Sequence, residues 1–260
     1  MIHKFTDIHP NAKIGENVKI DAFSVIHDNV EIGDGTWIGS NVTIMPGARI
    51  GKNCKIFPGA VISAIPQDLK FAGENTTAEI GDNTTIREFV TINRGTVEKM
   101  TTKVGSNCLI MAYAHVAHDC IVGNNVILAN CVNLAGHVII HDYAILEGLV
   151  AVQQFVTIGA HAFVTGGSLV RKNVPPFVKA AREPLSFVGV NAVGLRRRGF
   201  SNETIMQIED IYRTLYVRGY NISNALTIIE QEAPVSKEKD LILEFIRASK
   251  NGIMRGLSND

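Results

Sequence analysis

The chain has 260 residues, of which 46% are hydrophobic, and 25 Lys and Arg balance 25 Asp and Glu. This is the composition of an ordinary globular protein, without the net charge that would draw it to nucleic acid or a membrane surface. There is no apolar run long enough for a transmembrane helix and no charged-then-apolar leader, so we expect a cytoplasmic protein.

The dominant pattern is a six-residue aliphatic repeat that starts at the N-terminus. Two gaps, 62–80 and 92–104, keep its phase because each is a multiple of six residues. An array of this length is the signature of a parallel β-helix. The repeated positions are Ile2, Ile8, Ile14, Ile20, Ile26, Ile32, Ile38, Ile44, Ile50, Ile56, Ile62, Ile80, Ile86, Ile92, Val104, Ile110, Val116, Val122, Leu128, Leu134, Ile140, Leu146, Val152, Ile158, Val164 and Val170.

Each hexapeptide predicts one short strand and one corner. The residue two before each aliphatic is small or branched, as at Ala12 and Ser24, so two inward side chains flank an outward one. The third residue after each aliphatic is often Asn or Gly, as at Asn17 and Gly35. These residue types tolerate the left-handed backbone conformation that a tight corner needs. Three corners would make a coil of 18 residues, about 4.8 Å per coil. The period alone fixes neither the three sides nor the handedness.

Two segments, 63–79 and 93–103, leave the repeat as loops. Such inserts are often no more than tolerated surface decoration, yet long loops on a rigid scaffold frequently carry function. The first insert contains Gln67, Asp68 and Lys70 close together in the sequence.

Polar residues break the rules of the repeat in one region. Asp119 and His137 occupy the corner position that elsewhere prefers Asn or Gly, and they are 18 residues apart. A lone histidine at a corner is usually solvated surface, but several on one edge favour chemistry, because His suits a general base near neutral pH. A glycine beside such a histidine would let the carbonyl oxygen of a substrate approach the backbone N–H closely. We expect one outer edge to gather His115, His118, Asp119, Gly136, His137 and Gln154.

The cysteines and the C-terminal part complete the prediction. Cys54, Cys108 and Cys120 fall at inward positions and Cys131 at a corner, so we expect buried free thiols, not disulfides or a metal site. The repeat ends at Pro176, which gives a β-helix domain over 1–176. Residues 177–260 then form a connector and a helical domain. In the helical domain we expect a first helix after the N-cap Ser201. A second and a third helix are expected over about 222–232 and about 237–250.

One edge of a prism is convex and cannot enclose a substrate. A groove therefore needs a second wall, and the simplest wall is another copy of the same prism. This argument predicts a homotrimer with sites between its subunits.

Six short motifs are spread across the chain. They are 66–73 (PQDLKFAG), 115–120 (HVAHDC), 134–138 (LAGHV), 174–177 (VPPF), 189–191 (GVN) and 195–200 (LRRRGF). Together they resemble the UDP-N-acetylglucosamine O-acyltransferases, a family of hexapeptide-repeat enzymes. The resemblance implies a left-handed all-β parallel β-helix followed by α-helices. It also implies transfer of a 3-hydroxyacyl chain from acyl carrier protein to the 3-hydroxyl of UDP-N-acetylglucosamine, the first step of lipid A biosynthesis.

The same resemblance implies roles for individual residues. His118 would be the general base, Asp119 would orient it, and the Gly136 N–H would bind the oxyanion. The acyl donor would arrive on the phosphopantetheine of the carrier protein, so no bound cofactor and no metal are expected. Residues implied to hold sugar, phosphate or acyl groups are Gln67, Asp68, Lys70, His115 and His137. Residues implied to hold the uridine diphosphate are Gln154, Asn191, Arg197 and Arg198.

The chain departs from this family at several positions. Gln153 stands where many relatives have His, and Pro184 and Val193 stand where several have polar residues near the nucleotide. The family position of Gly166 influences acyl length, so a glycine there favours a long 3-hydroxyacyl chain. We expect Gly166 at a turn on the coil below the His118 column, in the path of the acyl chain.

Three other interpretations stay open at this stage. The later N-acyltransferase of the same pathway usually has a domain before the repeat, whereas here the repeat starts at Ile2. A γ-class carbonic anhydrase would bind zinc through histidines such as His115, His118, His137 or His141, but their spacing does not match that family. A purely structural β-helix would not cluster His, Asp and Gln on one edge.

Overall fold

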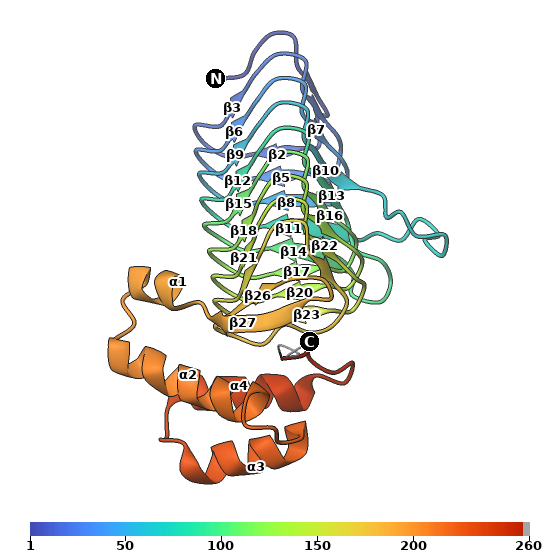
Figure 1. The fold of residues 1–260 in the computed structure, drawn as a ribbon. Coiled ribbons are helices and arrows are strands. Elements are labelled where there is room, and N and C mark those ends of the chain that lie inside the picture. Colours follow the sequence, from blue (N-terminus) through green and yellow to red (C-terminus); the bar gives the residue numbers. More distant parts are fainter. Residues whose placement is uncertain (257–260) are drawn as a thin grey trace.

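The computed structural model describes residues 1–256 and shows a three-sided prism followed by a helical domain (Figure 1). The prism is a left-handed parallel β-helix. Strands join partners in the coils above and below, and consecutive coils align residues 18 apart, as His115 aligns with Asn133. The period of six residues did not by itself fix the number of sides, and the structure confirms the predicted coil of three sides and 18 residues.

Three sheets form the sides of the prism within residues 1–256. The first, called here the B sheet, stacks β1 (Asp7–Ile8), β4 (Val25–Ile26), β7 (Thr43–Ile44), β10 (Val61–Ala64), β13 (Thr91–Asn93), β16 (His115–Val116), β19 (Asn133–Leu134), β22 (Ala151–Val152) and β25 (Leu169–Val170). The second, the C sheet, stacks β2 (Lys13–Ile14), β5 (Glu31–Ile32), β8 (Ala48–Ile50), β11 (Thr77–Ile80), β14 (Thr101–Val104), β17 (Ile121–Val122), β20 (Ile139–Ile140) and β23 (Thr157–Ile158).

The third side, the A sheet, ends in a hairpin. It stacks β3 (Lys19–Ile20), β6 (Trp37–Ile38), β9 (Lys55–Ile56), β12 (Thr85–Ile86), β15 (Leu109–Ile110), β18 (Ile127–Leu128), β21 (Ile145–Leu146), β24 (Phe163–Val164), β26 (Val178–Ala181) and β27 (Ser186–Val190). β26 pairs parallel to β24, and β27 pairs antiparallel to β26. The segment expected to be a connector therefore adds two strands to the prism, a feature that the six-residue pattern did not contain.

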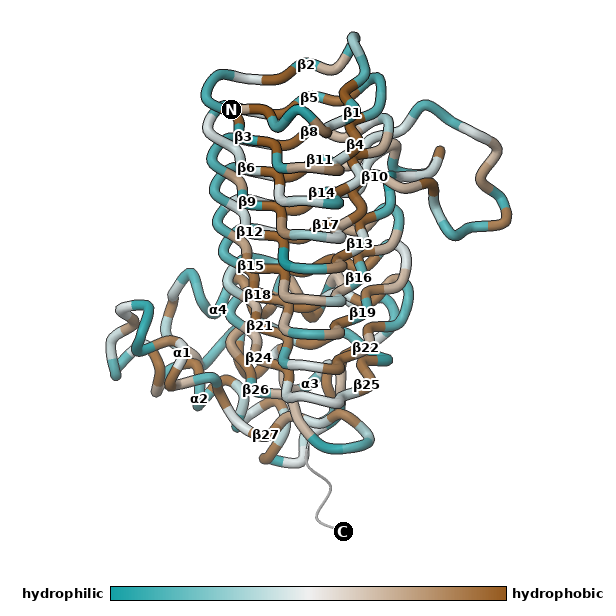
Figure 2. The backbone as a smooth tube through the Cα atoms, turned by 90° about the horizontal axis from the view of Figure 1, so that it is seen from above, coloured by the Kyte–Doolittle hydropathy of each residue, from teal (hydrophilic) through white to brown (hydrophobic). Residues whose placement is uncertain are grey.

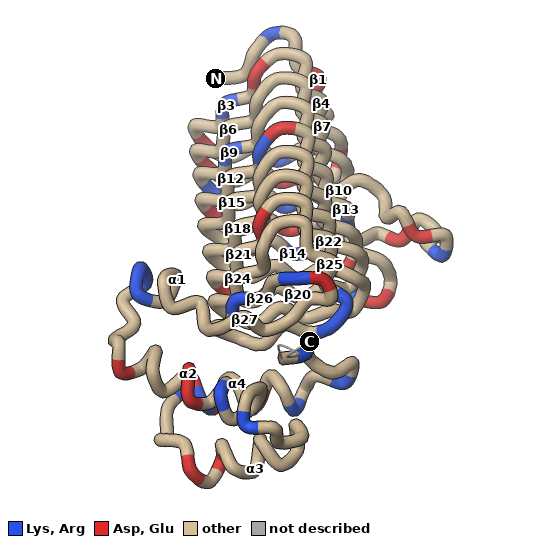
Figure 3. The backbone as a smooth tube through the Cα atoms, in the orientation of Figure 1, with Lys and Arg blue, Asp and Glu red and all other residues tan. Residues whose placement is uncertain are grey.

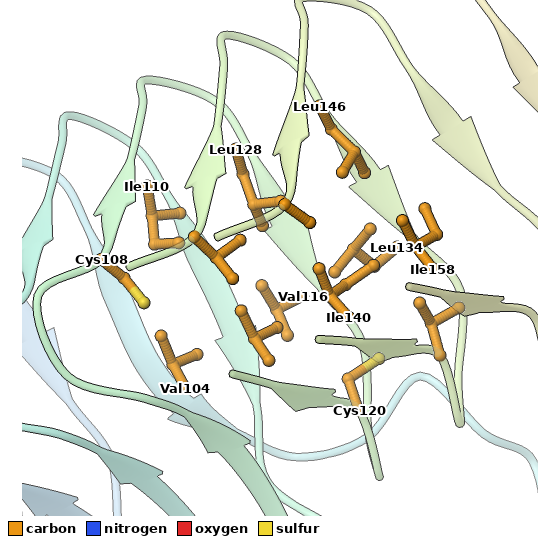
Figure 4. Close-up of a cluster of buried hydrophobic side chains, with 14 of the residues drawn as sticks. Val104, Cys108, Ile110, Val116, Cys120, Leu128, Leu134, Ile140, Leu146 and Ile158 are labelled. Carbon is orange, nitrogen blue, oxygen red and sulfur yellow. The ribbon is translucent and has the colours of Figure 1, made fainter. Parts of the chain in front are cut away.

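The repeated aliphatic residues fill the prism, as predicted. Figure 4 shows Ile110, Leu128 and Leu146 from the A sheet facing Val116, Leu134 and Ile140 from the other two sides. Ile2 is an exception, since it is 50% exposed in the first coil, where no coil lies above it. The hydrophobic colour in Figure 2 follows the strands of the prism. All four cysteines are free thiols, three of them buried.

Three edges join the sheets, and the edges organise the site. The corner residues have positive φ values, such as 56° at Asn17 and 57° at Asn125, which is the geometry that Asn tolerates best. We call the edges BC (from the B sheet to the C sheet), CA and AB. The two loops cover 65–76 and 94–100, shorter than expected because β10, β11, β13 and β14 extend into them. The longer loop projects from the prism beside β10 (Figure 1).

Four helices follow the hairpin within residues 1–256. They are α1 (Ala192–Arg197), α2 (Asn202–Tyr216), α3 (Ile222–Glu232) and α4 (Lys237–Ala248). Ser201 caps α2, as expected, by accepting a hydrogen bond from the Thr204 N–H. No helix among these residues is long and apolar enough to cross a bilayer. Lys and Arg alternate with Asp and Glu along the upper C sheet, where Lys13 pairs with Glu31 and Lys103 pairs with Glu79 (Figure 3).

Candidate active site

A histidine and an aspartate form a bonded pair on the BC edge. His118 and Asp119 follow strand β16, and Asp119 takes the left-handed corner with φ 60°. The Nδ1 atom of His118 lies 2.8 Å from Oδ2 of Asp119. An ionised carboxylate accepts but does not donate, so this contact places the ring proton on Nδ1. Nε2 is then the nitrogen that can take a proton from another molecule.

The pair is buried, which corrects the expectation of an open outer edge. His118 is 7% exposed and Asp119 is 1% exposed. The loop 94–100 closes over the carboxylate, where the Thr96 hydroxyl donates to Oδ2 at 2.6 Å and the Thr96 N–H donates to Oδ1 at 2.9 Å. Burial by itself would raise the pKa of Asp119, but the hydrogen bonds from Thr96 and His118 outweigh it and hold that pKa below its usual value. Asp119 therefore stays ionised beside His118.

Gly136 lies against the His118 ring one coil further along. A Cβ atom added at Gly136 would lie 2.6 Å from Cε1 and 2.7 Å from Nε2 of His118, so a side chain there would displace the ring. The Gly136 carbonyl accepts a hydrogen bond from the Phe155 N–H at 3.3 Å. Within residues 1–256 the Gly136 N–H itself meets no acceptor. It is free to donate to a ligand oxygen next to His118.

His137 and His115 flank the pair from two sides. His137 Nε2 lies 3.6 Å from Asp119 Oδ2 and 3.5 Å from Glu98 Oε2, and its ring stacks on Phe155 at 4.8 Å. His115 Nδ1 is 2.7 Å from the Thr91 hydroxyl. Burial, with a smaller effect of His118, lowers the pKa of His115, which favours its neutral ring. The five residues from His115 to His137 thus meet on one edge, as predicted.

Other predicted ligand residues lie on the same edge but apart from this cluster. Gln154 is exposed at the same edge, one coil beyond Gly136. Gln67 and Lys70 are exposed in the loop 65–76, where the Lys70 N–H donates to the Asp68 carboxylate at 3.0 Å. In the described part of the chain, no hydrogen bond or ion pair links this loop to His118 or Asp119.

The arginines and Asn191 lie on the CA edge. Asn191 is buried and caps α1, where its side chain accepts from the Gly194 N–H and donates to the His161 carbonyl at 3.0 Å. Arg197 is exposed, and the Arg198 guanidinium lies 5.4 Å from the centre of the Tyr143 ring. Both arginines are therefore on a different edge of the same chain from His118.

Gly166 lies on the third edge, AB, which corrects its expected place below the His118 column. It follows β24 of the A sheet, and its N–H donates to the Glu147 carboxylate at 3.0 Å. The positive φ in this turn is 71° at Gly167, not at Gly166. The backbone at 166 therefore needs no glycine. The residues predicted for one site occupy all three edges of a single prism.

The hexapeptide pattern missed the groups that enclose the pair. Thr96 binds both oxygens of Asp119, the Thr102 hydroxyl accepts from the Asp119 N–H at 2.8 Å, and Phe155 supports His137. One signal could have found Thr96. The insert that contains it starts directly after β13, the strand that pairs with β16.

Known families match both parts of the chain. Residues 173–254 match the family described as UDP N-acetylglucosamine O-acyltransferase, domain 2. Residues 29–64 and 101–136 match the bacterial transferase hexapeptide family.

Named relatives match almost the full length of the chain. The acyl-(acyl-carrier-protein)–UDP-N-acetylglucosamine O-acyltransferase of Thiobacillus denitrificans is 46% identical over 255 residues, which cover 98% of this chain and 99% of that protein. The UDP-N-acetylglucosamine acyltransferase structure from Bacteroides fragilis is 52% identical with a TM-score of 0.97, and the match covers 98% of this chain and 100% of that one. The Francisella novicida enzyme is 41% identical with a TM-score of 0.95, over 98% and 94% of the chains. With this fold and these full-length relatives, the chain belongs to the family of acyl-carrier-protein-dependent UDP-N-acetylglucosamine O-acyltransferases.

Proposed function

We propose that this enzyme transfers a 3-hydroxyacyl chain from acyl carrier protein to the 3-hydroxyl of UDP-N-acetylglucosamine, the first step of lipid A biosynthesis. The observation that carries the proposal is the His118–Asp119 pair beside the free N–H of Gly136. The names of the full-length relatives supply the two substrates. The acyl group would arrive as a thioester on the carrier's phosphopantetheine, so the enzyme needs no cofactor of its own.

The geometry suits a direct transfer. His118 Nε2 takes the proton of the 3-hydroxyl while that oxygen attacks the thioester carbon, and Asp119 stabilises the imidazolium that forms. The Gly136 N–H donates to the oxyanion of the tetrahedral intermediate. The intermediate then collapses, the C–S bond breaks, and the imidazolium returns its proton to the departing thiolate. The products are the acylated sugar nucleotide and the free carrier thiol.

We further propose that the enzyme is a homotrimer whose three subunits contact one another along their AB edges. Large apolar residues stand exposed there, including Phe23 at 63%, Tyr113 at 59% and Leu149 at 68%. Phe23 stacks on Phe5, and Tyr113 stacks on Phe89. An exposed apolar ridge of this kind is typical of a protein interface. A threefold axis along the ridge would cover it in a closed assembly.

This arrangement would build one groove from two copies. With the AB edges at the axis, the B sheet of one copy faces the A sheet of the next. The rims of the groove are then the BC edge with His118 and the CA edge with Arg198, and Gly166 lies at its inner end. The A sheet offers the groove a row of half-buried apolar side chains in register, which suits an acyl chain. That row is Leu109, Ile127, Ile145 and Phe163.

A direct assay tests the reaction. The purified enzyme is given UDP-N-acetylglucosamine and a series of 3-hydroxyacyl carrier proteins of different lengths, and the acylated nucleotide is measured by mass spectrometry. We expect product, with long donors preferred. Folded enzyme that makes no acylated nucleotide with any donor would overturn the proposal.

Subunit mixing tests the shared groove. His118→Ala and Arg198→Ala trimers should each have low activity. Random subunit exchange between equal amounts of the two variants should give about a quarter of the grooves two intact walls. Each groove takes its His118 wall from one subunit and its Arg198 wall from the neighbouring subunit, and each wall is intact in half of the subunits. Light scattering should show a trimer throughout. An active monomer, or mixed trimers without recovered activity, would contradict the arrangement.

Metal chemistry at the same cluster is a second candidate. His118, Asp119 and His137 offer ligand atoms within 4.8 Å of one another. Such a set of donors could hold a zinc ion, as histidines do in a γ-class carbonic anhydrase. Both oxygens of Asp119 already accept hydrogen bonds from Thr96, however, which suits an oriented carboxylate better than a metal ligand. Metal analysis of the active enzyme, and activity in the presence of a chelator, separates the two.

The four free cysteines fit a reducing compartment, so we propose the cytoplasm as the location.

A further inference from the structure

The corner residues of the CA edge change character in the last coils of the prism. Asn or Gly occupies this column in the earlier coils, and aromatic residues replace them near the helical domain. All keep a left-handed backbone, with φ values of 57° at Asn125, 61° at Tyr143, 59° at His161 and 65° at Phe177. The column is Asn17, Gly35, Asn53, Asn83, Asn107, Asn125, Tyr143, His161 and Phe177.

This replacement costs stability, because a bulky side chain in left-handed backbone is less favourable than Asn. The rings form a continuous stack, with Tyr143 on His161 at 4.8 Å and His161 on Phe177 at 5.5 Å. Burial, aided by Arg198, lowers the pKa of His161 to about 4, so the stack is uncharged at neutral pH.

Arg198 rests on the end of this stack, and no carboxylate of residues 1–256 forms an ion pair with it. Its guanidinium lies over the Tyr143 ring at 5.4 Å, and its Nη1 atom is buried without a hydrogen-bond partner among those residues. Burial lowers the pKa of Arg198, because taking a guanidinium out of water disfavours its charged form. In residues 1–256 the arginines that form ion pairs are Arg49, Arg87, Arg171, Arg213 and Arg247.

The helix that carries Arg198 is tied to the same column. Asn191 caps the start of α1 and donates to the His161 carbonyl at 3.0 Å. Arg198 follows the end of α1 and returns to Tyr143, one coil above His161. The corner residues therefore hold both ends of α1, and the ring of Tyr143 faces the charged group itself.

We propose that Tyr143 is a positioning residue that holds Arg198 ready for a phosphate oxyanion of the substrates. The inference rests on the proposed function and adds to it a residue that acts through Arg198. A cation held on an aromatic face keeps its N–H groups free for hydrogen bonds in the plane, which suits bidentate binding of phosphate. Two sources share this chemistry. They are the diphosphate of the sugar nucleotide and the phosphodiester of the carrier's prosthetic arm.

The repeat itself supplies the test variant. Tyr143→Asn restores the residue that Asn125 provides one coil above, so the left-handed backbone conformation is favoured and the protein should fold. It removes the aromatic face under Arg198 together with the stack on His161. Tyr143→Phe is the matched control, because it keeps the ring and the corner.

We expect Tyr143→Asn to raise one KM by about 3- to 30-fold, the range of a partly desolvated cation–π contact, with kcat within about twofold. Tyr143→Phe should behave like the wild type. A rise in the KM for UDP-N-acetylglucosamine, with an equal weakening of UDP binding in calorimetry without acyl donor, assigns the diphosphate. A rise only in the KM for the acyl carrier protein assigns the phosphodiester.

A double-mutant cycle with Arg198→Ala checks that Tyr143 acts through the arginine. The double variant should then be no worse than Arg198→Ala alone. Unchanged KM values in Tyr143→Asn, or full additivity in the cycle, would overturn the inference. So would a loss confined to kcat with a lowered melting temperature. Wild-type enzyme that binds UDP but transfers no acyl group would instead refute the proposed function.

Discussion

The Asp119 carboxylate decides which nitrogen of His118 is available for chemistry. It holds Nδ1 at 2.8 Å and is itself held by two hydrogen bonds from Thr96. An aspartate fixed in this way needs no movement when the imidazole becomes charged, so the pair is organised before a substrate arrives.

His118→Ala should lower kcat by at least about 10²-fold, the usual scale for the loss of a general base. The fold should survive, because Asp119 keeps both hydrogen bonds to Thr96. Turnover is measured alongside circular dichroism and light scattering, which must match those of the wild type. Near-normal turnover in such a folded trimer would refute the role of His118.

Gly136→Ala tests the space beside the base. The added Cβ would lie 2.6 Å from the His118 ring, so the ring must move. Displacing a reacting group by about 1 Å can cost about 10²-fold in rate, and we expect a loss of that order with little change in melting temperature. Ala135→Gly, which alters the neighbouring residue without adding atoms near His118, serves as the control. Equal rates for Gly136→Ala and the wild type would show that the ring has room to shift.

The strands and corners were the most predictable elements, because each depends only on neighbours in the repeat. The aliphatic positions gave the inward face, and Asn or Gly marked the left-handed corners. The 18-residue register then placed His118 beside Gly136. Burial of the pair could not be predicted, since it depends on how the loop 94–100 folds back over Asp119. The β26–β27 hairpin was missed because it lacks the period of six.

The aromatic column on the CA edge should make stability depend on pH. The pKa of His161 is lowered from 6.5 to about 4, mainly by burial. The unfolded chain therefore takes up this proton more readily, so the contribution of neutral His161 is complete above pH 6.5 and is lost as the pH falls toward about 4. The slope from this group is at most about 1.4 kcal/mol per pH unit.

His161→Phe should flatten that dependence, because Phe keeps the stack and cannot be protonated. Melting temperatures are compared between neutral pH and about 4.5. The variant should lose less stability than the wild type over this range while matching it near neutrality. Parallel curves for the two proteins would mean that another group is responsible.

At the scale of the whole molecule, the three edges of one prism carry different parts of the proposed groove. His118 and Arg198 lie on different edges, and only a neighbouring copy would bring them face to face. Gly166 would then lie at the inner end of the groove, beside the proposed threefold axis.

Gly166→Met should shift the preference toward shorter 3-hydroxyacyl donors, since each methylene lost from contact is worth about 0.8 kcal/mol. A Cβ at 166 meets the Gly148 carbonyl at 3.1 Å, and the backbone there is not left-handed, so the variant should fold. Gly148→Met, one coil nearer to His118, should shorten the preferred donor further. A competition assay with mixed donors measures both. If both folded variants kept the donor preference of the wild type, the residues that limit acyl-chain length would lie elsewhere in the groove.

The exposed Ile2 in the first coil has a consequence for how the molecule comes apart. Each coil touches only the coils next to it, so the prism resembles a zipper with nearest-neighbour stability. One end is closed by β26, β27 and the helices, whereas the first coil has no neighbour above it, and Ile2 remains 50% exposed. Fraying should therefore start at the N-terminal end. Amide hydrogen exchange should show protection that rises from β1 toward the coil of His118, and uniform protection along the prism would instead indicate a single cooperative unit.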